Sequence, residues 1–294
     1  MRASAVAVAV VSLCSCAPSG ETRAGAGTPP ADSAVPAPPP VPVAMTRVMA
    51  LLEPALRARD ALPGRLRPDS GTSAADSAFL EARGDFAVAI DSVGSAVWSD
   101  EALQTWVTGD PAAADSAKAA FTARGLRLTW SEGSAYPSED TGAWLRIAGP
   151  YLTAPMREYL ARRDHDEAQG FTDDAALRIP WDSLAERIAR WDRFIERHPG
   201  FVLLREAEMW RGIFLRTYLT GIDNSRVFDD TLVTEVRGSY ERFVALHGAT
   251  RTGRLVAGYL EVLRLSGGKE TDAVRSYRAA HGIGSMIGMQ PPVR

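Results

Sequence analysis

The second half of the chain carries one apolar pattern twice, and this repetition restricts the fold more than any other feature. Residues 191–195 (WDRFI) and residues 240–244 (YERFV) agree in chemical type at every position, at an offset of 49. The same offset relates three further pairs: His198 and His247, Arg205 and Arg254, and Trp210 and Tyr259. Because the agreement covers two successive helical stripes, the sequence predicts a helical hairpin that is used twice and stacks on its own copy.

Apolar spacing places the helices of these hairpins. The stripe that begins at Trp181 recurs at intervals of three and four up to Ile195, and His198-Pro199-Gly200 ends that helix. The other helices are expected at residues 202–219, 232–246, 255–265 and 271–280. We therefore expect a helical-repeat region at 181–281 and a disordered tail at 282–294.

The preceding region, 45–180, is also expected to be mainly helical. One helix should end near Pro63-Gly64, and the next is weakened by Gly84. Between Leu126 and Trp130 the apolar period changes to two, and the chain can return through Ala135-Tyr136, which predicts a small β-hairpin at about 126–136. The expected fold class is mainly α: a helical-hairpin repeat body with one small β-hairpin insertion.

Two resemblances accompany this architecture. The aromatic stripe with its His-Pro stop is similar to helices of tetratricopeptide-like (TPR/HEAT-like) envelope lipoproteins. Residues 132–140 (EGSAYPSED), with Tyr151-Leu152-Thr153, Tyr159-Leu160 and the stretch from Asp174 to Trp181, resemble a family of uncharacterised bacterial lipoproteins in which a hairpin interrupts a helical body. This resemblance implies a fold and a location in the cell envelope, and no activity.

The first sixteen residues have the order of an export signal. Arg2 precedes an apolar run from Ala5 to Val11, which is shorter than the roughly 20 residues of a membrane span. Leu13-Cys14-Ser15-Cys16 resembles the lipobox of bacterial lipoproteins, which implies removal of residues 1–15 and lipidation of Cys16. An ordinary cleaved signal is the alternative. Ala17, where inner-membrane lipoproteins have Asp, implies the periplasmic face of the outer membrane.

Residues 16–44 are expected to form a disordered linker. The segment is rich in Pro and Ala, with five prolines between residues 36 and 42, and it has too little apolar surface to fold. At about 3.1 Å per residue it can extend on the order of 80 Å. A lipid anchor at Cys16 would therefore keep the folded part near a membrane. We expect this membrane to be one partner of the protein.

Composition and motifs exclude several classes of site. The net charge of −3 argues against nucleic-acid binding, which requires a basic surface. Four scattered histidines and the single cluster Asp164-His165-Asp166-Glu167 predict no metal site, because adjacent residues do not share a helix face. No phosphate loop or nucleophile motif indicates a cofactor or covalent catalysis.

Carboxylates near the hairpin are the remaining candidates for catalysis. Glu132, Asp140 and Asp174 could hydrolyse a glycoside if two of them converged in one cleft. Capping is the alternative role of Asp140 and Asp174, which precede expected helices, and Glu132 lies in an expected turn. Asp223-Asn224-Ser225 can be a connecting turn or part of a binding site.

Three functions stay open at this level. The first is a non-enzymatic, lipid-anchored interaction module that binds an envelope protein or peptide along its repeat. The second is a carboxylate-dependent cell-wall or glycan hydrolase. The third is a structural envelope lipoprotein without a specific ligand.

The anchor is directly testable. Metabolic labelling with an alkynyl fatty acid, followed by mass spectrometry, is expected to show acylation of a chain that begins at Cys16. Cys16→Ser should abolish the label, whereas Cys14→Ser, which alters a residue of the cleaved segment, should retain it. An unlabelled wild-type chain that keeps residues 1–15 would contradict the assignment.

Overall fold

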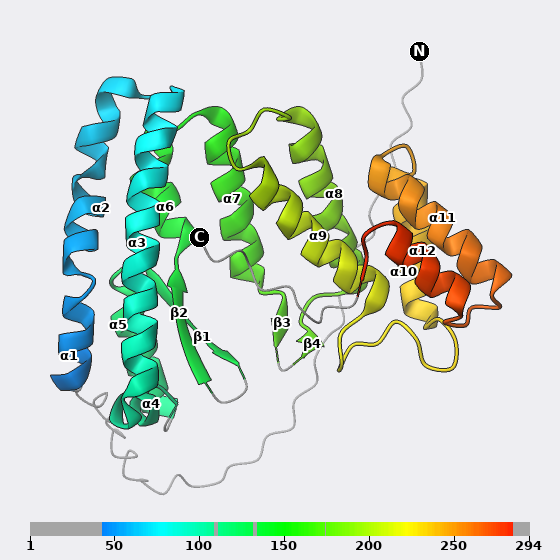
Figure 1. The fold of residues 1–294 in the computed structure, drawn as a ribbon, viewed down its shortest axis with the longest axis horizontal. Helices are drawn as coiled ribbons and strands as arrows, with labels where there is room; N and C mark the ends of the chain where they lie inside the picture. The colour runs from blue at the N-terminus through cyan, green and yellow to red at the C-terminus, as the bar shows by residue number, and fades with distance from the viewer. Residues whose placement is uncertain (1–42, 109–110, 132–133, 174, 285–294) are drawn as a thin grey trace, which may run out of the picture. The chain divides into compact units, whose positions relative to one another are not determined.

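The computed structural model describes residues 43–108, 111–131, 134–173 and 175–284, which belong to one compact unit, Pro38–Arg294 (Figure 1). These residues form twelve α-helices and two short antiparallel strand pairs, so the predicted mainly helical class is confirmed. The signal at residues 1–15 and Cys16 lie outside the described residues. The first helix begins at Val43, two residues inside the segment expected to be linker.

The helices fall into two sets along the chain. Those before residue 180 are α1 (Val43–Ala50), α2 (Glu53–Leu66), α3 (Ser73–Ser99), α4 (Glu101–Thr108), α5 (Pro111–Thr122), α6 (Thr141–Ile147) and α7 (Ala154–Gln169). Those after it are α8 (Trp181–Arg197), α9 (Leu204–Thr220), α10 (Thr234–His247), α11 (Arg251–Leu265) and α12 (Asp272–Ala280). None of the described helices has both the length and the hydrophobicity that crossing a bilayer requires.

One expected helix boundary is wrong, and a glycine expected to weaken the next helix does not interrupt it. Helix α2 continues through Pro63 to Leu66, because the completely buried Leu62 and Leu66 hold its last turn in the core. Helix α3 passes Gly84 without interruption, since its buried stripe, which includes Phe79 and Phe86, lies on another face. Tertiary burial here outweighs the local preferences of Pro and Gly.

The predicted hairpin is present and longer than expected. Strand β1 (Leu126–Ser131) pairs with β2 (Ser134–Glu139), and Pro137 lies inside β2 opposite Leu128. Pro137 can occupy this strand because β2 pairs only with β1 and therefore needs no amide donor on its other edge. Helix α3 covers the hairpin and brings Gly94 close to the Pro137 ring.

The prediction of a single hairpin is wrong. A second pair, β3 (Thr172–Asp173) with β4 (Ala176–Leu177), follows α7. Strands of two residues are too short to show a period of two, so no sequence pattern marks them.

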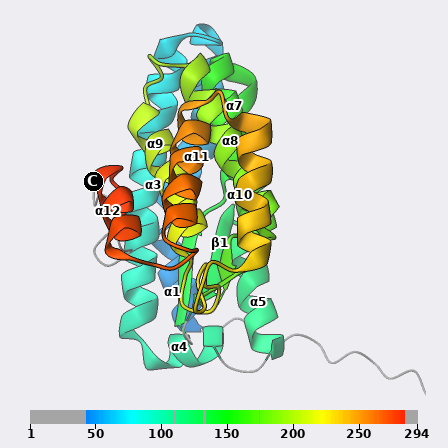
Figure 2. The same ribbon diagram turned by 90° about the vertical axis from the view of Figure 1, so that its right-hand side faces the viewer.

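The C-terminal helices pack as two hairpins, α8 with α9 and α10 with α11, and α10 also packs against α8 (Figure 2). At the end of α8, the His198 ring lies 4.9 Å from the Phe194 ring, and at the end of α10 the His247 ring lies 5.1 Å from that of Phe243. Both imidazoles lie close to a glutamate of the preceding helix layer, at 3.1 and 3.0 Å: His198 at Glu158 and His247 at Glu186. The two histidines and the two phenylalanines at equivalent positions therefore make equivalent contacts.

A continuous ladder of aromatic rings joins the hairpins. Its successive centroid distances are 6.3, 4.8, 6.0 and 5.9 Å, along Trp181, Tyr218, Tyr240, Tyr259 and Tyr277. Edge and tilted contacts of this kind are each worth about 0.5–1.5 kcal/mol beyond burial. Burial raises the pKa of Tyr218 and Tyr240, whose hydroxyls form hydrogen bonds inside the stack.

Helix α7 is joined to α8 by a buried ion pair. Arg187 Nε lies 3.1 Å from Asp166 Oδ1, and both side chains are at most 5% exposed. Trp191 Nε1 donates to Asp166 Oδ2 at 2.8 Å. Arg187 Nη2 donates to the Gln169 side chain and to the Gly170 carbonyl at 3.1 and 3.0 Å. Burial lowers the pKa of Arg187, and the charge of Asp166 opposes that shift.

A second ionic network links the N-terminal helices to the repeat. Arg83 of α3 donates to both oxygens of Glu139 and, at 3.3 Å, to Glu206 of α9. Tyr159 of α7 donates to the same Glu206 oxygen at 2.5 Å. Burial disfavours the charge of Arg83, but hydrogen bonding and the charge of Glu139 outweigh it and raise the Arg83 pKa. Three helices and one strand thus meet in one network around Arg83 and Glu206.

The described C-terminal residues are ordered beyond the predicted start of the disordered tail. Ile283 is 6% exposed, belongs to the core, and its amide donates to the Arg278 carbonyl at 2.8 Å. The predicted tail boundary at residue 282 is therefore wrong for residues 282–284, whereas residues 285–294 lie outside the described residues.

Removing Asp166 tests the first ionic network. Asp166→Ala leaves the buried Arg187 charge uncompensated and is expected to lower the free energy of unfolding by about 3–5 kcal/mol. Urea denaturation followed by circular dichroism measures this loss. Asp182→Ala, which breaks an exposed pair with Arg242, is the matched control and should leave the midpoint nearly unchanged. Equal losses of unfolding free energy in the two variants would show that the buried ion pair contributes no more to stability than the exposed one.

Candidate functional site

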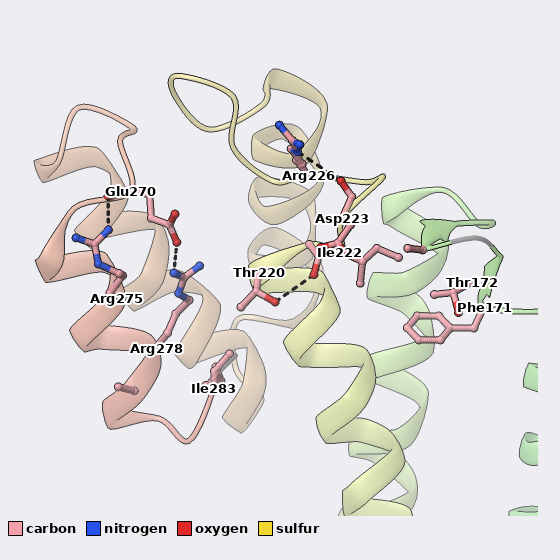
Figure 3. Close-up of a pocket in the computed structure, with 14 residues that line it drawn as sticks. Phe171, Thr172, Thr220, Ile222, Asp223, Arg226, Glu270, Arg275, Arg278 and Ile283 are labelled. Atoms are coloured by element: carbon pink, nitrogen blue, oxygen red, sulfur yellow. Dashed lines mark hydrogen bonds and ion pairs between the residues drawn. The ribbon is translucent and has the colours of Figure 1, made fainter. Parts of the chain in front are cut away.

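A groove of about 980 Å³ lies between the end of α9, the β3–β4 segment and α12 (Figure 3). Its apolar lining includes Phe171, Ile222, Ala279 and Ile283. Its polar lining includes Arg226, Arg275 and Arg278, together with Asp223 and Glu270. Apolar surface with a few polar groups is typical of ligand-binding concavities.

One wall of the groove follows from the end of α9. Gly221 has φ +71°, and a Cβ there would lie 2.6 Å from the Ser225 carbonyl oxygen, so the tight turn at 222–225 requires glycine. The Asn224 amide donates to the Ala175 carbonyl at 2.9 Å. The Leu177 amide donates to Ser225 Oγ at 2.8 Å. This turn therefore holds the β3–β4 segment against the end of α9.

Ala175, which accepts the hydrogen bond from the Asn224 amide, has a strained backbone conformation. Ala175 has φ +53° and is the only described residue other than glycine with positive φ. The left-handed conformation costs a residue with a Cβ about 1–2 kcal/mol. Such strain persists only where surrounding contacts impose it, and it is frequent at binding sites. Here the imposed contact is the hydrogen bond from Asn224.

The three arginines of the groove differ in their partners. Arg278 is 9% exposed and pairs with Glu270, while Arg275 pairs with Asp272 at 2.6 Å. Arg226 is exposed and donates only to the Asp223 carbonyl, at 3.4 Å; no carboxylate of the described residues lies within 4.0 Å of it. The guanidinium of Arg226 is thus available to an anionic group of a ligand (Figure 3).

The carboxylates considered for catalysis do not lie in this groove. Asp140 caps α6, accepting from the Gly142 amide at 3.0 Å, and pairs with Arg127 and Arg146 at 3.5 and 3.4 Å. Its observed contacts are those of the capping alternative. Glu132 and Asp174, the other two candidates, lie outside the described residues.

Arg127 gathers further acids next to Asp140. Asp164 and Glu167 lie 3.6 and 3.4 Å from its guanidinium. Burial raises the pKa of Glu167, against the charge of Arg163 and a hydrogen bond from Thr141. These carboxylates converge on a cation, so they neutralise Arg127 and do not form an acid–base pair facing a substrate.

The cluster Asp164-His165-Asp166-Glu167 separates in space. Asp164 pairs with Arg127, whereas His165 Nε2 lies 3.0 Å from Arg190 Nη1. Asp166 is buried against Trp191, and Glu167 accepts from Thr141. Successive helical positions point in different directions, as expected for neighbours on a helix.

Sequence reasoning located one part of the groove and missed the rest. The sequence allows Asp223-Asn224-Ser225 to be a turn or a binding segment, and the structure shows a turn that lies at the groove. Arg226 and Ala175 carry no motif, and the sequence predicts a disordered tail where the structure buries Ile283. Their proximity arises from contacts between segments that are far apart in the chain, which local patterns do not encode.

Comparison with known proteins adds no assignment. No protein-family profile, curated protein or solved structure shows a significant match to the chain.

Strain at Ala175 can be measured. Ala175→Gly is expected to increase the free energy of unfolding by up to about 1 kcal/mol. Glycine relieves the strain of the left-handed conformation, but it also loses more conformational entropy on folding, which offsets part of the gain. The matched control is Ala176→Gly in the adjacent strand, which should be destabilising by about 0.5–1 kcal/mol. Chemical denaturation of both variants checks the sign, and destabilisation by Ala175→Gly would show that no strain is stored there.

Proposed function

We propose that this chain is a lipid-anchored protein of the bacterial cell envelope, a non-enzymatic helical module that binds an envelope protein or peptide in the groove beside α12. The observation that carries the proposal is the combination of apolar lining with Arg226, which has no carboxylate partner among the described residues. Such a surface suits a chain segment that presents apolar side chains and one carboxylate.

The arrangement of helices supports binding of a protein segment. Stacked helical hairpins form extended concave surfaces, and their terminal units commonly differ from the internal ones. Here α8–α9 and α10–α11 repeat, and α12 follows as a single helix that borders the groove. A tetratricopeptide-like repeat type, and membership in the lipoprotein family whose motifs the chain resembles, are part of this proposal.

The anchor and the location rest on the N-terminal sequence. A lipidated Cys16 followed by a Pro-rich linker would hold the module on the periplasmic face of the outer membrane. Stable anchoring requires two lipid or electrostatic signals, which a diacylated cysteine supplies. From such a position the module can reach partners within the length of the linker.

The structure offers less support for a carboxylate-dependent hydrolase than for a binding module. Asp140 is engaged as a helix cap and with two arginines, and the acids near it surround Arg127. A structural lipoprotein without a ligand would not require an exposed arginine beside a strained loop.

Photo-crosslinking tests the groove. A photoreactive residue at Ile222 in the intact envelope is expected to capture a specific polypeptide, and Arg226→Glu should reduce that capture at least about tenfold, since it replaces an attractive charge by a repulsive one. The control is Arg205→Glu at the other end of α9, where an exposed arginine lies outside the groove. Equal capture by both variants, or none by the wild type, would contradict the proposal.

A further inference from the structure

Two aromatic side chains form an exposed pair where α3 meets β2. Trp98 is 52% exposed and Tyr136 is 42% exposed, and their ring centroids are 5.8 Å apart. Most other described aromatic residues are buried in the core or the ring ladder. The pair therefore leaves large apolar surface in contact with solvent at one place.

The two stretches of chain that carry the pair are themselves uncharged. Residues 92–99 at the end of α3 and residues 134–138 of β2 contain no acidic or basic side chain. Asp100 and Glu101 follow at the edge of this uncharged stretch. The surface thus combines two amphipathic rings with neutral backbone and small side chains.

The pair lies at the end of the helical layer where the described chain begins. Helix α3 runs down to α4, and α1 starts beside α4, so Trp98 and Val43 lie at the same end (Figures 1 and 2). Twenty-six residues separate Val43 from Cys16. The aromatic pair therefore lies at the same end of the fold as the first described residue, to which the linker is joined.

Trp and Tyr with one half-exposed face are enriched at the boundary between lipid headgroups and acyl chains. We propose that Trp98 and Tyr136 insert into the headgroup region of the bilayer that carries the lipid anchor, and so orient the module on the membrane. This inference rests on the proposed lipid anchoring at Cys16. Two rings bind a bilayer weakly by themselves, but tethering makes the contact intramolecular and raises its effective concentration.

The charge distribution specifies the lipid. Asp100 and Glu101 beside the rings are repelled by an anionic surface. The proposed contact is therefore with zwitterionic headgroups, and it should weaken as anionic lipid is added.

Depth-dependent fluorescence quenching tests the contact. The chain from Cys16 onward, whose only thiol is Cys16, is coupled to a thiol-reactive phospholipid in phosphatidylethanolamine and phosphatidylcholine vesicles that contain brominated acyl chains. This coupling replaces acylation in the cell, so the test stays informative if the natural anchor is absent. Part of the tryptophan emission is expected to be quenched, and Trp98→Phe should abolish that quenching while keeping a ring against Tyr136.

A matched control moves the reporter along the same helix. Val88, 66% exposed in the middle of α3, is replaced by Trp in the Trp98→Phe background, and this residue should escape quenching. Equal quenching of the two reporters, or none at Trp98 in the tethered chain, would overturn the proposal. A spectral shift of Trp98 on addition of soluble glycan strands, without quenching by brominated lipid, would instead assign the pair to sugar stacking and overturn it as well.

Discussion

The buried pair between Asp166 and Arg187 is the interaction on which the C-terminal half depends. It joins α7 to the first repeated hairpin, and the same guanidinium holds the carboxyl end of α7 through Gln169 and Gly170. The chain leaves that point as Phe171, whose ring packs on Phe214 at 5.1 Å and whose segment continues into the groove wall. The buried Arg187 thus helps to set the direction in which the chain leaves α7. An apolar residue of equal volume at position 187 could keep the packing, but it could not donate the two hydrogen bonds to Gln169 and Gly170.

Several features of the groove are unfavourable for local stability. Gly221 allows the tight turn that ends α9, while Ala175 is forced into a conformation that glycine would occupy at lower cost. Arg226 is exposed and has no carboxylate partner among the described residues, although Arg275 and Arg278 beside it are paired. Departures from the rules of local stability gather at one place, which is the pattern expected of a binding site.

Much of the helical architecture could be predicted, because apolar stripes are local and repeat at fixed spacing. The sequence alone shows that Phe194 and His198 are equivalent to Phe243 and His247. In the structure each histidine ring contacts the phenylalanine ring of its own helix at a similar distance. The β3–β4 pair and the burial of Ile283 were not predictable in this way. Two-residue strands lack a period, and Ile283 is ordered by its contact with Arg278, not by its neighbours in sequence.

The helical class, the repeated hairpin, the first strand pair and the expected lipid anchor all follow from spacing or order within short stretches of sequence. Which charges meet depends on tertiary packing. Arg83 finds Glu139 and Glu206 at separations of 56 and 123 residues, and the groove combines the ends of α9 and α12 with the segment after α7. Side chains that distant come together through the packing of whole helices, and no local pattern records that packing.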